Sequence, residues 1–337
     1  MARMARSRFL PDNFTLALVA TVALATLLPA AGGVAQFFDG LTTAAIGLLF
    51  FLHGAKLSRE AILAGVTHWR LHLLVFCCTF VLFPFLGWAL KPVLAPLVTP
   101  ELYLGILYLC VLPATVQSAI AFTSLARGNV PAAVCSASAS TLLGVFVTPL
   151  LVNLLVVQRH GGSSLASVGR ILLQLMVPFV LGHLLRPWIG GFVKRHAAGL
   201  KFVDQGSILL VVYTAFSAAV VEGLWKQVPL SALAGLLVVC AVLLALALTL
   251  TTLAARKLGF DKADEITIVF CGSKKSLASG VPMAKVLFPA HAVGAIVLPL
   301  MVFHQLQLMV CAVLAQRYAR RPETPDAEPG NEGWSRA

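Results

Sequence analysis

Two adjacent lysines in the middle of a long apolar segment are the residues of this sequence best placed to do chemistry. Lys274 and Lys275 lie about halfway along the apolar residues 263 to 288. An ionised side chain at the centre of a bilayer costs roughly 2.5 to 3.5 kcal/mol on insertion scales, so it is kept where it faces protein or water. Lys275 would lie about 18 Å along a helix from residue 263, near the bilayer midplane. We therefore expect a buried functional site around the pair.

On a continuous helix the two lysines would point in different directions. Lys275 would share a face with Cys271, whereas Lys274 would lie with Phe270. We expect Lys275 to face the protein interior, where it could gain and lose a proton or stay charged and attract an anionic solute. The alternative is a fixed structural cation that is held by carbonyl groups of residues 102 to 126 in place of a bound ion.

Hydroxyl, thiol and amide groups accompany the lysines and recur in the segment from 102 to 126. The candidate residues for binding a solute or an ion are Lys275, Ser276, Ser273, Cys271, Lys274, Ser118, Gln117 and Thr115. Serine and threonine in membrane helices often bond to their own backbone, so a structural role for each hydroxyl stays open.

Prolines and glycines in the same two segments predict interrupted helices. The candidate interruptions are at Pro113, Gly272, Gly280 and Pro282. An interruption frees main-chain groups and helix ends that can bind ions at mid-membrane depth. We therefore expect the site where the two interrupted segments cross.

Composition places these segments in a membrane. Of 337 residues, 59% are hydrophobic and 11% are charged, whereas soluble domains carry about a quarter charged residues. Apolar stretches of roughly 20 residues fill the chain, each long enough to cross about 30 Å of hydrocarbon, and strand periodicity is absent. We predict an all-α integral membrane protein in contact with lipid. The ten predicted spans are residues 12 to 31, 38 to 55, 68 to 90, 102 to 126, 131 to 157, 165 to 187, 200 to 222, 229 to 255, 263 to 288 and 290 to 316.

The distribution of basic residues orients these spans. Of the 25 lysines and arginines, 18 fall on the side of the N-terminus, 4 fall on the other side, and Lys274, Lys275 and Lys285 lie within the ninth span. Cytoplasmic loops carry an excess of basic residues, so we expect both termini in the cytoplasm and the spans in the plasma (inner) membrane. The net charge of +12 is then explained by topology rather than by nucleic-acid binding.

An offset of 158 residues indicates an internal repeat. It aligns Thr115 with Ser273 and Ser118 with Ser276. Each half would contain five spans, an odd number, so the halves would have opposite membrane orientation, as in many transporters. Within a single transporter domain, we predict a cytoplasmic N-terminus at 1 to 11, a first repeat at 12 to 157, a loop at 158 to 164, a second repeat at 165 to 316 and a disordered cytoplasmic tail at 317 to 337.

No motif in the sequence indicates an enzyme or a metal site. A P-loop, a dinucleotide fingerprint, a nucleophile elbow and an HExxH pattern are all missing. The seven cysteines lie inside predicted spans, without zinc-ligand spacing or a disulfide framework. We therefore expect no catalytic residue and no cofactor.

Four stretches of the chain resemble the bile acid:sodium symporter superfamily, in the symporter-like subgroup that is related to solute carrier family ten member seven. These stretches are Phe50 to Ser58, Leu112 to Ala119 with Gly128 and Asn129, Val147 to Leu151, and Phe270 to Leu277. The resemblance covers nearly the whole chain. It implies ten helices as a five-plus-five inverted repeat, a panel domain against a core domain, and discontinuous fourth and ninth helices that cross.

The chain departs from that family where sodium would bind. In bile acid symporters the ninth helix offers a glutamate and a glutamine to sodium, and the resemblance places Cys271 and Lys275 at these positions. Ser118 matches a sodium-binding serine, but Ala119 replaces the asparagine beside it. An ammonium group can supply the charge of the missing ion, which suits uniport or proton coupling better than sodium coupling.

These observations predict a secondary transporter that moves a small organic anion by alternating access, with an intramembrane lysine replacing the sodium site. The alternative is a non-transporting membrane regulator of ion homeostasis that keeps the symporter fold. Substrate identity and oligomeric state stay open, because pocket shape and a few polar contacts set specificity.

Overall fold

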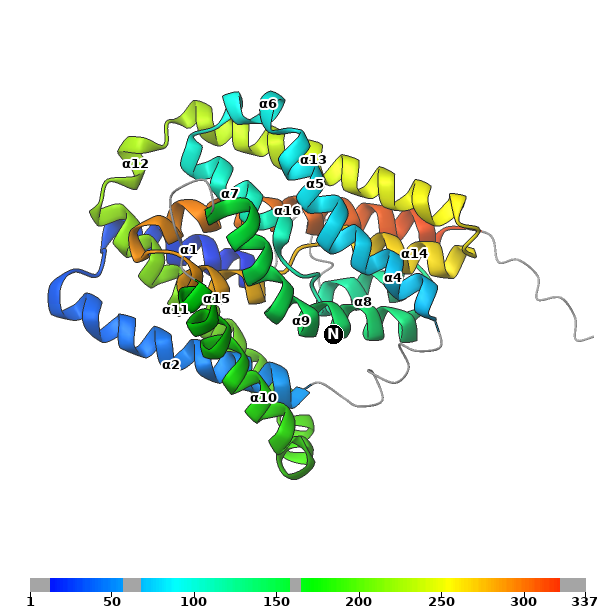
Figure 1. Ribbon diagram of the computed structural model, residues 1–337, viewed down its shortest axis with the longest axis horizontal. Coiled ribbons are helices and arrows are strands. Elements are labelled where there is room, and N and C mark those ends of the chain that lie inside the picture. The colour runs from blue at the N-terminus through cyan, green and yellow to red at the C-terminus, as the bar shows by residue number, and fades with distance from the viewer. Residues whose placement is uncertain (1–12, 57–67, 158–164, 322–337) are drawn as a thin grey trace, which may run out of the picture.

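The protein is helical throughout the part of the chain that the structure describes, residues 13–56, 68–157 and 165–321 of a computed structural model (Figure 1). No strand occurs in these ranges, so the all-α prediction is confirmed for them. The segments predicted at 1 to 11 and 158 to 164 lie outside the described residues. The last helix continues to Ala319, so the first three residues of the predicted tail are helical, and residues 322 to 337 lie outside the described residues.

Seven helical segments of the described chain are long and apolar enough to cross a membrane. They are α2 (Gly32–Lys56), the segment Trp69–Ala89, α9 (Val130–Val152) with the π-helical turn η3 (Asn153–Val157), α10 (Leu165–Arg195), α11 (Ala197–Val221), α13 (Leu230–Lys257) and α16 (Ala290–Ala319). The protein is therefore a multi-pass membrane protein.

Shorter helices occupy the other three predicted spans. They are α1 (Asn13–Leu27), then α7 (Pro100–Val111) followed by α8 (Gln117–Leu125), and later α14 (Lys262–Gly272) followed by α15 (Leu277–Leu287). Each of the last two spans is thus divided into two helices. The ten-span inverted repeat stays a prediction.

The segment Trp69–Ala89 changes its helical winding near its middle. It consists of α4 (Trp69–Cys77), a π-helical turn η1 (Cys78–Leu82) and α5 (Phe83–Ala89). Such a turn disrupts the regular hydrogen-bond ladder and commonly occurs at functional sites. Short helices α6 (Lys91–Leu94), η2 (Ala95–Leu97) and α12 (Leu224–Gln227) complete the described connections.

Side-chain caps set several helix starts that position the site. Thr99, Asn129 and Asp261 each accept a hydrogen bond from the first turn of α7, α9 and α14, respectively. These caps satisfy amides that have no partner within the helix, and proline follows two of them in the first turn. The caps fix where α7, α9 and α14 begin, and α7 and α14 lead into the two interrupted parts of the chain.

Helices α2 and α10 pack against each other and cross in the lower part of Figure 1. Their backbones touch at two glycines. A methyl group on Gly54 would lie 1.9 Å from the Phe179 carbonyl oxygen, and one on Gly182 would lie 2.0 Å from the Phe51 carbonyl oxygen. Small residues permit this close approach, as in many membrane helix pairs.

Helix α16 runs through the centre of the molecule and packs against α7, α11, α13 and α15 (Figure 1). Its Phe303 is fully buried and lies edge-on to Phe83 of α5, with ring centroids 6.0 Å apart. Lys274 and Lys275 are among the largest fully buried side chains of the described chain. The apolar centre therefore encloses two groups that are costly to bury.

Candidate functional site

The fourth predicted span is interrupted beside Pro113. Helix α7 ends at Val111, and α8 begins at Gln117. Pro113 has no N–H group, and the next amide, that of Ala114, donates to Ser140 Oγ at 2.9 Å instead of to α7. The last carbonyls of α7 therefore lack helical donors and carry the partial negative charge of a helix C-terminus.

The ammonium group of Lys275 binds at this C-terminus. Its Nζ donates to the carbonyl oxygens of Cys110 at 2.8 Å, Leu112 at 2.7 Å and Thr79 at 2.8 Å. It also lies 4.2 Å from the centroid of the Phe83 ring. An ammonium group has three N–H donors, so these carbonyls satisfy all of them. We call this arrangement the carbonyl nest.

The π-helical turn η1 explains why the Thr79 carbonyl is available. In a regular helix Thr79 O would accept from the amide of Phe83, but that amide donates to Cys78 O. The next possible donor along the chain is Pro84, which has no N–H. The turn and the proline together leave one carbonyl without a helical partner, and Lys275 takes it.

The environment of Lys274 differs from the carbonyl nest, although its side chain is equally buried. Its Nζ donates to Ser118 O at 2.9 Å. It lies 3.8 Å from the centroid of the Phe122 ring and 5.4 Å from that of Phe270, which are cation–π contacts. Within the described ranges, neither lysine pairs with a carboxylate.

The ninth predicted span is interrupted next to the fourth. Helix α14 ends at Gly272, and α15 begins at Leu277. Across the gap, the amide of Ser276 donates to Pro113 O at 2.9 Å. The Ser276 hydroxyl accepts from the amide of Ser279 at 3.2 Å and so caps α15. The two interruptions are therefore in direct main-chain contact.

Gln307 of α16 holds the interruption from the other side, and sequence reasoning missed it. Its Oε1 accepts from the Lys275 amide at 2.9 Å, and its Nε2 donates to Lys275 O at 3.0 Å. The same Nε2 lies 2.9 Å from His304 Nδ1. Gln307 is fully buried. The sequence did contain a signal for it, because a primary amide inside an apolar membrane span needs hydrogen-bond partners within the protein.

A cavity of about 350 Å³ lies beside the interruptions. Four candidate residues from the sequence line it, namely Thr115, Gln117, Ser118 and Ser276. The N-terminal ends of α8 and α15 both contribute to its wall. Helix N-termini carry a partial positive charge, and α8 starts without a side-chain cap, so this wall favours an anion.

Charged residues of α2 and α11 also line the cavity, and sequence reasoning missed them as well. Lys56 forms an ion pair with Asp204, whereas Lys201 forms none within the described part of the chain. His53 and His304 also line the cavity. The wall therefore carries a surplus of positive charge.

The other four candidate residues do not line the cavity. Lys275 and Lys274 lie behind it, and Cys271 and Ser273 are fully buried. The Ser273 hydroxyl donates to Val269 O at 2.6 Å, which completes the end of α14. Lys275 therefore contacts main chain rather than the space for a solute, as the fixed-cation alternative requires.

Two of the predicted interruptions are wrong. Gly280 and Pro282 lie inside α15, which continues to Leu287. Gly280 provides close packing, because a methyl group there would lie 2.6 Å from side-chain atoms of both Leu112 and Leu300. Its carbonyl accepts from the Tyr108 hydroxyl at 2.7 Å. A single proline removes one helical donor, and the tertiary contacts around α15 outweigh that loss.

The residues around Lys275 do not fit a bound sodium ion. Sodium would need the oxygen atoms that the ammonium group already occupies, and the neighbouring Cys271 offers a thiol that points to Ala133 O at 3.9 Å. The described residues contain no cluster of three or more histidine, cysteine or acidic side chains that could hold a metal ion.

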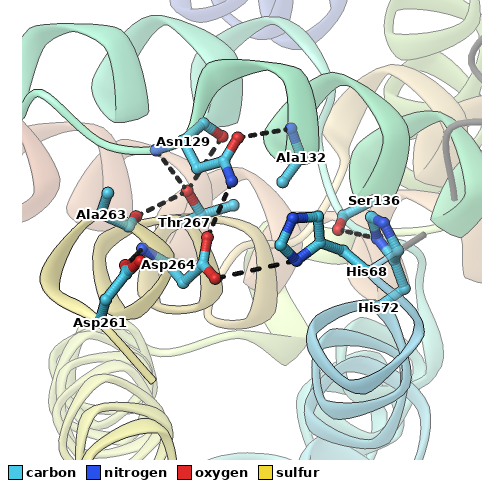
Figure 2. Close-up of polar contacts among 9 residues, drawn as sticks. All are labelled: His68, His72, Asn129, Ala132, Ser136, Asp261, Ala263, Asp264 and Thr267. Carbon is cyan, nitrogen blue, oxygen red and sulfur yellow. Dashed lines mark hydrogen bonds and ion pairs between the residues drawn. The ribbon is translucent and has the colours of Figure 1, made fainter. Parts of the chain in front are cut away.

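Figure 2 shows a second polar cluster, where the start of α9 meets the start of α14. The side-chain Nδ2 of Asn129 donates to Asp264 Oδ1 at 2.8 Å, and the main-chain N–H of Asn129 donates to Thr267 Oγ1 at 3.0 Å. His68 Nδ1 lies 4.0 Å from Asp264 Oδ2, and His72 Nδ1 lies 2.7 Å from the Ser136 hydroxyl of α9. These contacts fix the loop after α8 onto α14, and they do not reach the cavity.

Comparisons with known proteins cover nearly the whole chain. The model of the SBF-like CPA transporter family matches residues 12–320. An uncharacterized protein of Pseudomonas aeruginosa is 72% identical over 319 residues, which cover 94% of this chain and 96% of the relative. YfeH of Escherichia coli (strain K12), whose name includes the word symporter, is 62% identical over 322 residues, with 94% and 96% covered. Sodium/bile acid cotransporter 7 of Danio rerio is 28% identical over 320 residues, with 93% and 95% covered.

Proposed function

The chain belongs to the SBF-like CPA transporter family, and from this premise we propose that it is a secondary transporter of an organic anion. The family resemblance inferred from sequence motifs is confirmed. The observation that carries the proposal is the cavity of about 350 Å³ whose wall includes both interrupted spans. Its volume lies in the range of small-molecule sites.

The charge of the cavity supports an anionic solute. Two helix N-termini and the Lys201 side chain face the same space, where the nearest acid, Asp204, is paired with Lys56. A carboxylate, sulfonate or phosphate group could accept hydrogen bonds from the first amides of α8 and from Lys201. An organic cation would meet the positive ends of both helices.

Lys275 would take the place of the sodium ion of bile acid symporters. Its ammonium group links the interrupted ninth span to η1 through the Thr79 carbonyl and to the end of α7 through the carbonyls of Cys110 and Leu112. A covalently attached cation cannot be released and rebound, so this position cannot supply the free energy of a sodium gradient. Transport would then proceed as uniport or with proton coupling.

Alternating access would use the inverted repeat. Ten spans in two halves of opposite orientation, with both termini in the cytoplasm, would place the two interrupted spans in corresponding positions of the halves. The main-chain contact between Ser276 and Pro113 supports this relation. Rocking of one group of helices against the other would expose the cavity to each side of the plasma (inner) membrane in turn.

The test is uptake by purified protein in liposomes, with a panel of organic anions and matched organic cations. We expect saturable uptake of an anion without sodium, and Lys201→Gln should raise KM about tenfold by removing one charged hydrogen bond. Lys226→Gln is the control, because Lys226 lies on α12 outside the cavity. Uptake of cations instead would overturn the proposal, and a folded protein without any flux would favour the regulator.

A further inference from the structure

The orientation of the Gln307 amide follows from its partners on the main chain. The Lys275 N–H can only donate, so the atom 2.9 Å from it must be the oxygen, Oε1. The Lys275 carbonyl can only accept, so the atom 3.0 Å from it must be the nitrogen, Nε2. Both bonds agree on a single orientation, and reversing the amide would break both.

This orientation also determines the protonation of His304. The second N–H of Gln307 Nε2 points to His304 Nδ1 at 2.9 Å, so Nδ1 must accept a hydrogen bond. An imidazole that accepts at Nδ1 is neutral and carries its proton on Nε2. His304 lines the cavity, whereas Gln307 is fully buried behind it. A chain of hydrogen bonds therefore leads from the cavity to the peptide group of Lys275.

We propose that Gln307 is a positioning residue through which protonation of His304 in the cavity loosens the interrupted ninth span at Lys275. A proton from cavity water that binds at Nδ1 converts the acceptor into a donor. Two donors, Nδ1–H and Nε2–H of Gln307, then face each other, and the amide has to turn. Turning it breaks the bonds to the Lys275 peptide as well, because one planar group makes all three contacts.

The charges that share the cavity with His304 oppose its protonation when no anion is bound. Lys56 and His53 of α2 and Lys201 of α11 are basic, and Asp204 is the one acid in the described lining. The cavity residues of α8, α9 and α15 have no titratable side chain. A bound anion would stabilise the imidazolium, and by linkage the proton would strengthen anion binding. This step rests on the proposed function and assigns proton coupling to His304.

Hydrogen exchange of the Lys275 amide tests the chain of contacts without a ligand. Purified protein is compared between pH 8 and pH 5, after correction for the intrinsic pH dependence of exchange. We expect exchange to rise about tenfold as His304 is protonated, since the amide loses its hydrogen bond. His304→Gln, which can accept from Gln307 but cannot titrate, should abolish the rise. His72→Gln, which replaces a histidine of the second polar cluster outside the cavity, should leave it unchanged.

Nitrogen-15 NMR of labelled histidine tests the tautomer directly. We expect wild-type His304 to have its proton on Nε2 at pH 8 and Gln307→Glu to move it to Nδ1, because a carboxylate accepts where the amide donated. A proton on Nδ1 in the wild type, or an equal rise of exchange in His304→Gln, would overturn the proposal. Neither readout involves flux, so a protein with this response that carries no anion would contradict the proposed function alone.

Discussion

Lys275 and Lys274 are adjacent in the chain and equally buried, yet their surroundings differ in kind. Lys275 donates to three carbonyls, whereas Lys274 donates to the Ser118 carbonyl and otherwise contacts aromatic rings. The difference arises because α14 ends before the pair, so the two side chains extend toward different helices. Burial alone therefore does not identify the role of an intramembrane lysine.

The carbonyl nest makes Lys275 part of the scaffold. Removing its charge would leave three buried carbonyls of α7 and η1 without donors, whereas the Ser118 carbonyl that Lys274 contacts lies inside α8 and keeps its helical donor. An orphaned buried acceptor costs about 1 to 3 kcal/mol. Stability measurements on both lysines should show this asymmetry.

The largest effect should come from Lys275→Met. Methionine keeps an unbranched side chain but supplies no donor, so we expect a loss of about 3 to 5 kcal/mol in the free energy of unfolding. Denaturant unfolding in detergent measures it. A loss below that of Lys274→Met would remove the distinction between the two lysines.

Lys274→Met should cost less, about 1 to 2 kcal/mol, because one charge-assisted hydrogen bond and two ring contacts are lost. The same unfolding assay applies, and methionine can still pack against Phe122 and Phe270. Equal losses for the two variants would show that burial of charge, rather than the number of acceptors, sets the cost.

Added sodium should stabilise a protein that lacks the Lys275 ammonium group but not the wild-type protein. Lys275→Ala opens space among three carbonyl oxygens, so sodium at about ten times its dissociation constant should restore roughly 1.4 kcal/mol of the lost stability. Choline at the same ionic strength is the control. Wild-type protein should show no such gain, and stabilisation of the wild type by sodium would contradict the replacement of the ion by Lys275.

The smallest effect should come from Phe122→Leu, which removes the ring closest to Lys274. The loss should be about 1 kcal/mol, from the cation–π contact and a slightly smaller side chain. Phe85→Leu is the matched control, because Phe85 is exposed on the outside of α5. Thermal unfolding of both variants measures the difference, and identical midpoints would show that the ring does not stabilise Lys274.

Much of the helical framework could be predicted from sequence because apolar runs of membrane length are easy to recognise. Pro113 and Gly272 also marked real helix ends, since one lacks a donor and the other has a low helix propensity. Gly280 and Pro282 carry the same local signals, yet packing keeps them within α15. Local propensity alone could not separate these cases.

The candidate site was less predictable because its contacts are tertiary. Placing Lys275 and Lys274 on different faces assumed a continuous helix, whereas an interruption lets both be buried. The Thr79 carbonyl depends on the winding of another helix, and Lys201 reaches the cavity from α11. Residue type and spacing within one segment contain no information about such partners.

The glycine contacts between α2 and α10 have a mechanical consequence. Two peptide groups of each helix meet those of the other with no room for a methyl group, so sliding by one residue would drive a Cβ atom into a carbonyl. We therefore expect the two helices to tilt together as a rigid pair and not to slide past each other. Because His53 and Lys56 near the end of α2 line the cavity, tilting the pair would move these two side chains together relative to the rest of the lining.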